Sequence, residues 1–406
     1  MTMEVHADGR ESSRRGVHNP SEEDLRVSTL EIFFDVVFVL TLMRVSSMMG
    51  HHLTIEGTLQ TALVFIALFW MYGAYAYLTN QVPPDQNLRR YLMIFGMAGF
   101  LICAVAVPDT FGESGVAFGL GYLAVVLVHA ALYAQTYGWP VLLRFVPPNV
   151  ASALCITAAG LFDGTVAYIL WALPVLTFFI TPYFNWTAEE SKAIRINTGH
   201  FVERHGLLLI IVIGESIVAL GLGIQNYPID IATIVAVVLG IALAAAFWWC
   251  YFVEDAALAE RILTDQPVAH RLKHALSAYF YAFVPMLLGI VTVAAGMHET
   301  IGHLTEHLHL APALALAGGV ALFLIGAAAF RVALRIRPFA YRLITAVLAF
   351  GTIPLGMEVS ALAQLVALPA LIIAMLVLET DTQILASPLT TSTSSASSTP
   401  SASRSS

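Results

Sequence analysis

Repeated apolar runs of about 20 residues constrain the fold of this chain more than any other feature of its sequence. A bilayer core is about 30 Å thick and an α-helix rises about 1.5 Å per residue, so each run is long enough to cross it. Charged residues make up only 11% of the chain, whereas a soluble domain carries about 25%. The sequence therefore predicts an all-α, polytopic helical membrane protein.

The apolar runs predict twelve membrane-spanning helices. These lie near residues 28–49, 58–79, 89–107, 115–136, 147–162, 165–184, 204–224, 231–252, 275–296, 311–331, 340–356 and 359–379. The fifth and eleventh segments are short and lie beside prolines, so we expect tilted or broken spans there.

The basic residues indicate which side of the membrane each loop faces. With the N-terminus in the cytoplasm, every Lys and Arg except Arg44 falls in an inner segment or at the inner end of a helix. Basic residues concentrate on the cytoplasmic side of membrane proteins, and dropping or adding one early helix would scatter these charges to both sides. We therefore predict a multi-pass protein of the cell membrane with both termini in the cytoplasm.

Two halves of the predicted bundle can be aligned. Glu31 opens the first helix as Glu203 opens the seventh, and a Phe-Trp pair lies in both the second and the eighth helix. Each half has an even number of spans, so the halves share one orientation and form a parallel internal repeat. The predicted order is a disordered cytoplasmic tail (1–25), membrane repeat 1 (26–184), a cytoplasmic linker (185–203), membrane repeat 2 (204–380) and a disordered Ser/Thr-rich tail (381–406).

Two segments resemble the signatures of a known family. RVSTLEIFFDVVFVLTL is similar to Leu-Glu-Leu-Phe-Phe-Asp-Leu-Val-Phe-Val, and HFVERHGLLLIIVIGESIVALG is similar to His-x-x-Glu-Arg-x-Gly followed by Gly-Glu-Ser. These signatures belong to the bacterial low temperature requirement protein A (LtrA) family, and the resemblance runs from about Arg26 to Glu379. It implies a multi-pass membrane protein whose family name reports a growth phenotype and no chemistry. The family's polar residues fall on Glu31, Asp35, His200, Glu203, Arg204, Gly214, Glu215 and Ser216.

Charged residues inside the apolar runs are the main candidates for a functional site. Such residues are costly in a membrane, and they usually line a cavity, pair with one another or mark an ion pathway. The repeat places Arg44 at the depth of Glu215, so we expect these two to pair and Asp35 to be the proton carrier. The predicted intramembrane proton or ion site is Asp35, Glu215, Arg44 and Ser216. The alternative is that these groups only bond neighbouring helices together.

A second polar group is expected at the cytoplasmic ends of the helices. An acid near a helix N-terminus is favourable, which suits Glu31 at the start of the first span. His200, Glu203 and Arg204 stand at the start of the seventh helix. We interpret these four residues as a hydrogen-bonded cytoplasmic-end polar cluster.

No enzyme motif is complete in this sequence. HFVERH and HETIGH each place the second histidine one position away from a zinc-protease signature. His303 and His307 are four residues apart and could share a metal on a helical turn, but a solvated polar loop is the simpler interpretation. We therefore predict no enzyme activity, no cofactor and no metal.

Two classes of function are open at this stage. One is a proton- or cation-linked transporter or permease that uses the intramembrane acids. The other is a non-transporting scaffold, sensor or stress-adaptation factor in which the same charges lock helices together. The expected partners are the lipid bilayer and an unidentified small ion or small molecule. Nucleic acid is not expected, because no basic stripe with interleaved aromatic residues is present.

Overall fold

The computed structural model describes residues 27–51, 53–82, 84, 86–135, 139–180, 196–224 and 230–386. Among these residues the regular structure is helical, and no strand is present. Ten helical stretches in the described part are long and apolar enough to cross a membrane, and a further apolar helix, residues 165–180, is shorter. The predicted all-α membrane class is therefore confirmed, while the count of twelve spans stays a prediction.

Each predicted segment overlaps a helix. The first six are α1 (Thr29–His51), α2 (Ile55–Gln81), α3 (Asn87–Ala106), α4 (Gly115–Ala134), α5 (Trp139–Ala159) and α6 (Thr165–Ile180). The others are α8 (Thr198–Ile224), α9 (Ile231–Phe252), α12 (Phe283–Thr300), α13 (Leu310–Leu334), α14 (Ala340–Phe350) and α15 (Ala361–Ala386).

Several shorter elements complete the described chain. They are the 3₁₀ turn η2 (Val107–Asp109), the helices α10 (Asp255–Asp265) and α11 (Val268–Ala275), and the π-helical segments η4 (Leu276–Tyr281) and η5 (Leu355–Val359). α10 and α11 are not predicted by long apolar runs, because both helices are short and carry charged residues. A break in the eleventh span was expected, and α14 indeed ends before η5 begins.

The fifth helix starts earlier than the sequence predicts. α5 begins at Trp139, so Pro147 and Pro148 lie inside the helix instead of at its start. Prolines are tolerated in membrane helices where polar side chains satisfy nearby backbone groups. Pro147 and Pro148 have no N–H for the carbonyls four residues earlier. In the same turn, the Asn149 amide donates to the carbonyl oxygen of Phe145 at 2.7 Å.

Two predicted segment boundaries are also wrong. α8 begins at Thr198, so residues 198–203 belong to the helix and not to the linker. The side chain of Asn197 accepts a hydrogen bond from the His200 backbone N–H at 3.2 Å, which caps the helix at this earlier position. At the other end of the chain, α15 continues to Ala386, into the predicted tail. The predicted N-terminal tail, residues 185–195 of the linker and residues 387–406 lie outside the described residues.

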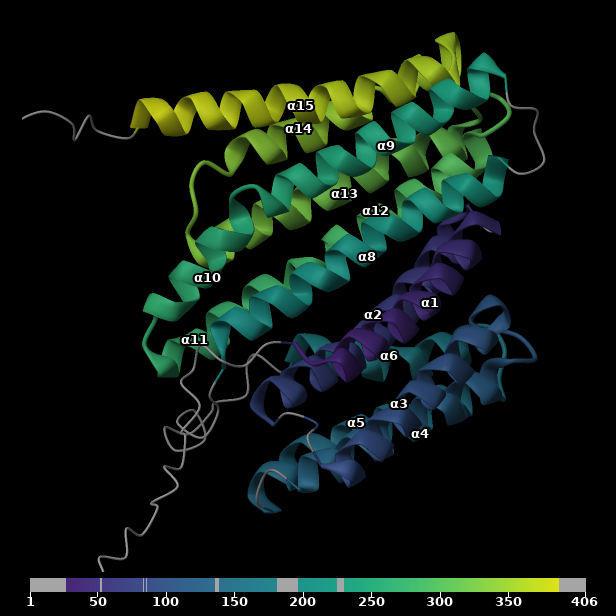
Figure 1. The fold of residues 1–406 in the computed structure, drawn as a ribbon. Helices are drawn as coiled ribbons and strands as arrows, with labels where there is room; N and C mark the ends of the chain where they lie inside the picture. The colour runs from purple at the N-terminus through teal and green to yellow at the C-terminus, as the bar shows by residue number, and fades with distance from the viewer. Residues whose placement is uncertain are drawn as a thin grey trace, which may run out of the picture.

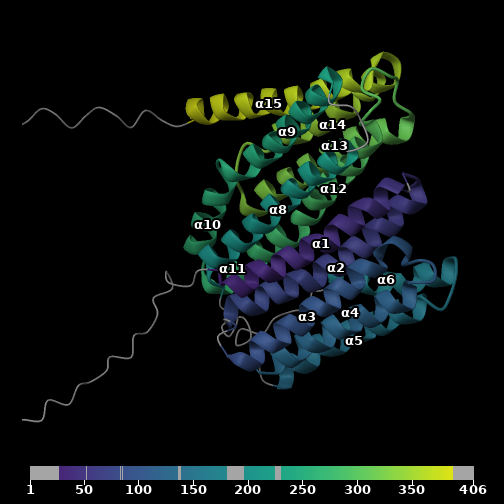
Figure 2. The same cartoon turned by 45° about the vertical axis from the view of Figure 1, so that its right-hand side comes forward.

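The helices lie in two groups, with α1–α6 in one and α8–α15 in the other (Figure 1), and a rotated view shows the same division (Figure 2). In the first group α3 packs on α4, α4 on α5, α5 on α6 and α6 on α2. In the second group α12 packs on α13, α13 on α14, α14 on α15 and α15 on α9.

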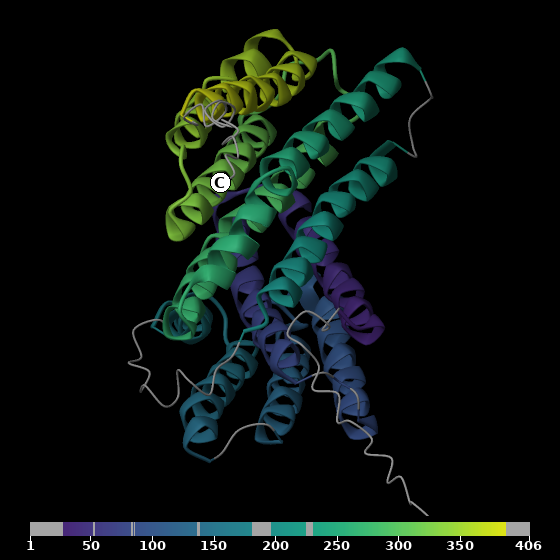
Figure 3. The ribbon, with the colours of Figure 1, turned by 60° about the vertical axis from the view of Figure 1, so that its left-hand side comes forward.

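The two groups meet mainly through α1, α8 and α12, and α2 also contacts α8 and α12. α1 contacts α8 and α12 of the second group as well as α2 and α3 of its own, and Figure 3 shows α8 beside the purple α1. We call the contact of α1 with α8 and α12 the central interface. Polar side chains on the facing sides of these helices are removed from lipid, which is where intramembrane charges are tolerated.

Candidate functional site

A cavity of about 460 Å³ lies at the central interface and is bounded by α1, α3, α8 and α12. Its polar lining comes from Arg44, Ser46 and Ser47 on α1, Glu215 on α8 and His298 on α12. The rest of the wall is apolar or small, with most of it from α1 and α3. We call this space the Glu215 cavity.

Glu215 is the buried acid of this cavity. Its side chain is 5% exposed, and its Oε2 atom has no hydrogen-bond partner among the described residues. A buried carboxyl oxygen without a partner costs about 1–3 kcal/mol or more, so it needs a proton, a water molecule or a ligand. Ser216, the next residue, does not line the cavity, and its hydroxyl donates to the Val212 carbonyl of the same helix at 3.4 Å.

The expected ion pair between Arg44 and Glu215 is absent from the described residues, so that prediction is wrong. Both side chains line the same cavity, but Arg44 is exposed and Glu215 is buried. An arginine that reaches an open cavity can be solvated there, so it does not need to contact an acid. Glu215 is therefore left without the counter-charge that the sequence assigned to it.

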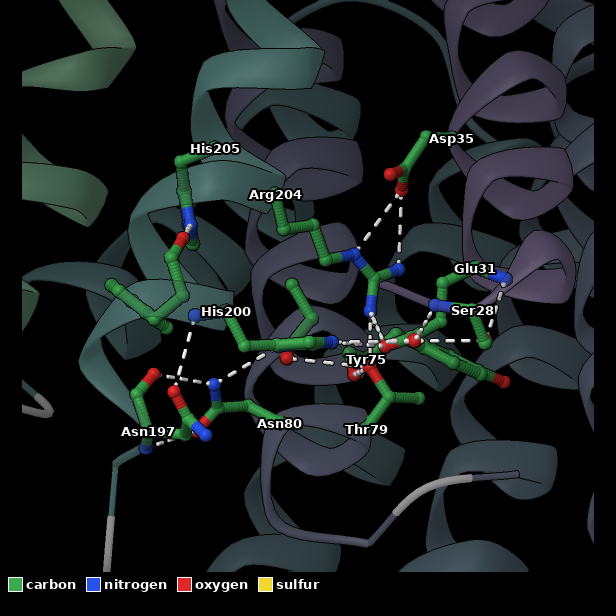
Figure 4. A network of polar contacts seen from close by, with 12 residues as sticks. Ser28, Glu31, Asp35, Tyr75, Thr79, Asn80, Asn197, His200, Arg204 and His205 are labelled. Atoms are coloured by element: carbon green, nitrogen blue, oxygen red, sulfur yellow. Dashed lines mark hydrogen bonds and ion pairs between the residues drawn. The ribbon is translucent and has the colours of Figure 1, made fainter. Parts of the chain in front are cut away.

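A buried ion network lies nearer the other ends of α1 and α8 (Figure 4). Arg204 donates to Glu31 Oε1 at 2.9 Å and to Asp35 Oδ1 at 3.1 Å, and it also donates to the Thr79 hydroxyl. Arg204, Glu31 and Asp35 are 1%, 2% and 0% exposed. Two acidic side chains thus hold one guanidinium in a dry site, an arrangement that suits the fork-shaped arginine side chain.

His200 extends this network to α2. Asn80 Oδ1 accepts from the Asn197 backbone N–H at 3.0 Å, which fixes the orientation of the Asn80 amide. Its Nδ2 therefore donates to His200 Nδ1 at 3.1 Å, so His200 Nε2 carries the proton that faces Glu31 at 3.3 Å. We call Glu31, Asp35, Thr79, Asn80, His200 and Arg204 the Arg204 network.

The Arg204 network combines residues that the sequence had assigned to two different sites. It contains Glu31, His200 and Arg204 from the expected cytoplasmic-end cluster, and it adds Asp35, which the sequence had grouped with Glu215. Glu203 is exposed and takes no part, so its assignment to the cluster is wrong. Successive helix residues are about 100° apart, so Glu203 points away from the face that Arg204 presents to α1.

Aromatic rings separate the Arg204 network from the cavity. Phe38 stacks on Tyr72 with ring centroids 4.3 Å apart, and Phe34 packs edge-on against Phe100 at 5.4 Å. Along α1 these phenylalanines come before Leu40, the first residue of that helix to line the cavity. The cavity therefore reaches Glu215 but not Asp35, which lies in the dry network.

A second buried ion network, which we call the Asp255 network, ties together α10, α13, α14 and α15. Asp255 contacts Arg331 at 2.9 Å and Arg342 at 2.6 Å, and Glu379 contacts the same arginines at 3.2 Å and 3.1 Å. All four side chains are buried. Sequence reasoning missed this network because each residue stands near a helix end, where a charge is ordinary. The apolar residues around Arg331 were the signal that it could be buried.

The histidine-rich loop after α12 carries a second hollow of about 500 Å³, lined in part by His303, His307 and Glu299. His303 Nδ1 lies 3.0 Å from Glu306 Oε2, and both side chains are exposed. In the described part of the chain, no three His, Cys, Asp or Glu residues are arranged to hold a metal ion. Among the described residues, His303 and His307 thus lack the further ligands that a metal site requires.

The similarity of this chain to known proteins covers most of its helical region. A family model described as "Bacterial low temperature requirement A protein (LtrA)" matches residues 26–377. A curated relative, described as "Uncharacterized protein RA0937" of Rhizobium meliloti (strain 1021), is 25% identical over 351 residues, which cover 82% of this chain and 83% of the relative. The matched family region includes every residue of the Glu215 cavity and of the Arg204 network.

Proposed function

This chain belongs to the bacterial low temperature requirement A (LtrA) family, and we propose that it is a proton- or cation-linked membrane transporter. The observation that carries the proposal is the cavity that reaches Glu215, a buried acid inside an apolar helix. An ionisable group at such a place can bind and release a proton or cation as solvent reaches it. Asp35 is the weaker candidate for this role, because Arg204 holds it in a dry ion pair.

The Arg204 network supports a gate on one side of the transport path. A transporter of this kind opens its binding site to one side at a time. The cavity provides access to Glu215 from one end of α1 and α8, while the Arg204 network binds α1, α2 and α8 together nearer the other end. Opening the second side would require these ion pairs to separate.

We also propose that the transporter consists of two parallel six-helix repeats, which gives twelve spans when α6 and α8 are included. The pattern of helix neighbours supports this arrangement. α1 packs on α2 and α3 as α8 packs on α9 and α12. The sequence of contacts from α3 through α4, α5 and α6 to α2 corresponds to that from α12 through α13, α14 and α15 to α9.

The proposed location is the cell membrane with both termini in the cytoplasm, so that the Glu215 cavity faces outward. We expect single cysteines at Glu113 and His303 to react with a membrane-impermeant maleimide from outside intact cells, in a variant without the three native cysteines. A cysteine at Arg337 should react only after the membrane is opened. All three positions are exposed, so poor access does not explain an absence of labelling. Labelling at Arg337 from outside would reverse the proposed orientation.

The proposed transport activity is tested with Glu215→Gln in liposomes that contain a pH-sensitive dye. We expect the wild-type protein to carry protons when a pH gradient is imposed, and Glu215→Gln to fall to the leak of empty liposomes. The substitution keeps the shape of the side chain and removes a buried acid, so the melting temperature should not fall. Glu203→Gln is the matched control, because it makes the same change at an exposed position of the same helix. Unchanged proton flux in Glu215→Gln would rule out this role.

A non-transporting scaffold or sensor of stress is the second candidate function. The two buried ion networks favour it, because they hold helices of both groups in one dry arrangement. Wild-type liposomes that carry no H⁺, Na⁺ or K⁺ under gradients of either direction would support this alternative. In both cases we propose a protein that is not an enzyme and needs no cofactor.

A further inference from the structure

We propose that the Glu215 cavity binds a small zwitterion of the amino-acid type, with its ammonium group on Glu215 and its carboxylate on Arg44. This inference rests on the proposed function, because it names the substrate class of the same cavity. The observations behind it are two opposite charges in one space that do not pair with each other.

Glu215 supplies the site for the ammonium group. Its Oε2 atom lacks a hydrogen-bond partner within the described residues, and the side chain is nearly buried at the cavity wall. An alkylammonium ion has three N–H donors and a full positive charge, so it satisfies a carboxylate better than a water molecule does. Ser46 and Ser47, on the facing helix α1, add hydroxyl groups to the polar part of the lining.

Arg44 supplies the site for the carboxylate. Its guanidinium group forms no ion pair with an acid in the part of the chain that the structure describes, although it lines the cavity. Guanidinium binds a carboxylate through two parallel N–H donors. A ligand with only a positive charge would be repelled by Arg44, and one with only a negative charge by Glu215. A zwitterion is therefore the simplest small ligand that satisfies both groups.

The remaining lining indicates the side chain of the ligand. Apolar residues from α1, α3 and α12 form most of the wall, namely Leu40, Met43, Leu101, Ala104, Val105 and Ala294. Ligand cavities commonly measure about 300–1,000 Å³, so 460 Å³ is ample for one amino acid with water. An aliphatic side chain would be favoured over a charged one at such a wall.

The site links zwitterion binding to proton movement. Protonated Glu215 must release its proton to cavity water before the carboxylate can bind an ammonium group, so proton and zwitterion compete for one group. Binding of one at Glu215 therefore releases the other. The other charged or titratable groups that face the cavity are Arg44 from α1 and His298 from α12, and α3 contributes none. We expect binding to tighten as pH rises, because Glu215 is then ionised.

The test measures binding to the purified full-length protein in detergent by isothermal titration, so it does not depend on transport. The probes are the twenty standard amino acids and, for L-leucine, two matched analogues: isoamylamine, which lacks the carboxylate, and 4-methylpentanoate, which lacks the amine. We expect binding by aliphatic amino acids, and each analogue should bind about tenfold more weakly or worse, because it loses one charged hydrogen bond.

Single variants test the roles of Arg44 and Glu215 in binding one at a time. Arg44→Gln should remove the preference for L-leucine over isoamylamine, and Arg44→Lys should restore part of it. Because Arg44 is exposed, these changes should leave the fold intact, and Arg261→Gln, at an exposed position of α10, is the matched control. If His298→Gln keeps the rise of affinity with pH and Glu215→Gln removes it, Glu215 is the competing group. The opposite result would assign the competition to His298 and overturn the proposed coupling.

Three results would overturn the zwitterion site itself: no amino acid binds, isoamylamine binds as tightly as L-leucine, or Arg44→Gln leaves affinity unchanged. Each of these leaves the liposome test of Glu215 untouched. Conversely, amino-acid binding together with unchanged proton flux in Glu215→Gln would keep the site and reject the proton-linked transport.

Discussion

Arg204→Ala is expected to destabilise the protein by about 3–5 kcal/mol, which is the typical cost of removing one partner from a buried ion pair. Glu31 and Asp35 are both almost completely buried, so water cannot replace the lost guanidinium without opening the central interface. The Thr79 hydroxyl on α2 loses the same donor. The measurement is thermal unfolding of the purified variant in detergent, together with its yield in membranes.

Removing all three charges provides the decisive comparison. We expect Glu31→Gln, Asp35→Asn and Arg204→Met combined to be more stable than Arg204→Ala alone, because no unpaired charge is then buried. Glu203→Gln, one position from Arg204 but exposed, should change stability by about 0.5 kcal/mol at most. If Arg204→Ala melts like the wild type, or if the losses from the three single changes simply add, the charges are not coupled as the structure indicates.

Asp255→Ala should be similarly costly, at about 3–5 kcal/mol, because this acid is shared by two buried arginines. Without it, Arg331 and Arg342 face each other with Glu379 as the remaining buried acid of the network. We expect the ends of α10, α14 and α15 to separate. The measurements are amide hydrogen exchange, which should become faster in these helices, and the melting temperature, which should fall.

Glu254→Ala is a close control for this second network. Glu254 is adjacent to Asp255 and lies 3.5 Å from Arg331, but it is 36% exposed. Exposed ion pairs contribute about 0–1 kcal/mol, so its loss should have little effect. Equal destabilisation by Glu254→Ala and Asp255→Ala would contradict the assignment of Asp255 as the buried centre of the network.

The candidate site was only partly predictable from the amino-acid sequence. Charges inside apolar runs identified Asp35, Arg44 and Glu215, because the cost of placing a charge in a membrane applies to any helix of that composition. The pairing of these charges was not predictable in the same way. Alignment of the two halves suggested a contact between Arg44 and Glu215, yet the structure pairs Asp35 with Arg204 and leaves Glu215 at the cavity.

Prediction from neighbouring residues also fails where a step of one residue around a helix decides whether a side chain is buried or exposed. Glu203 and Arg204 are neighbours at the start of α8, and both stood in the expected polar cluster. About 100° of rotation places Arg204 against α1 and Glu203 in an exposed position. The sequence shows both charges but does not show which face of α8 meets α1.

By itself, the sequence determined the helical membrane class, the positions of the apolar helices and the family, because run length and local signatures depend on neighbouring residues alone. The tertiary structure alone decided which buried charges meet, where the cavity lies and that Asp255, Arg331, Arg342 and Glu379 form one network. Those features depend on the rotation and depth of helices that are far apart in the chain. Packing sets that rotation and depth, and the many side chains that contribute to it cannot be read from one helix at a time.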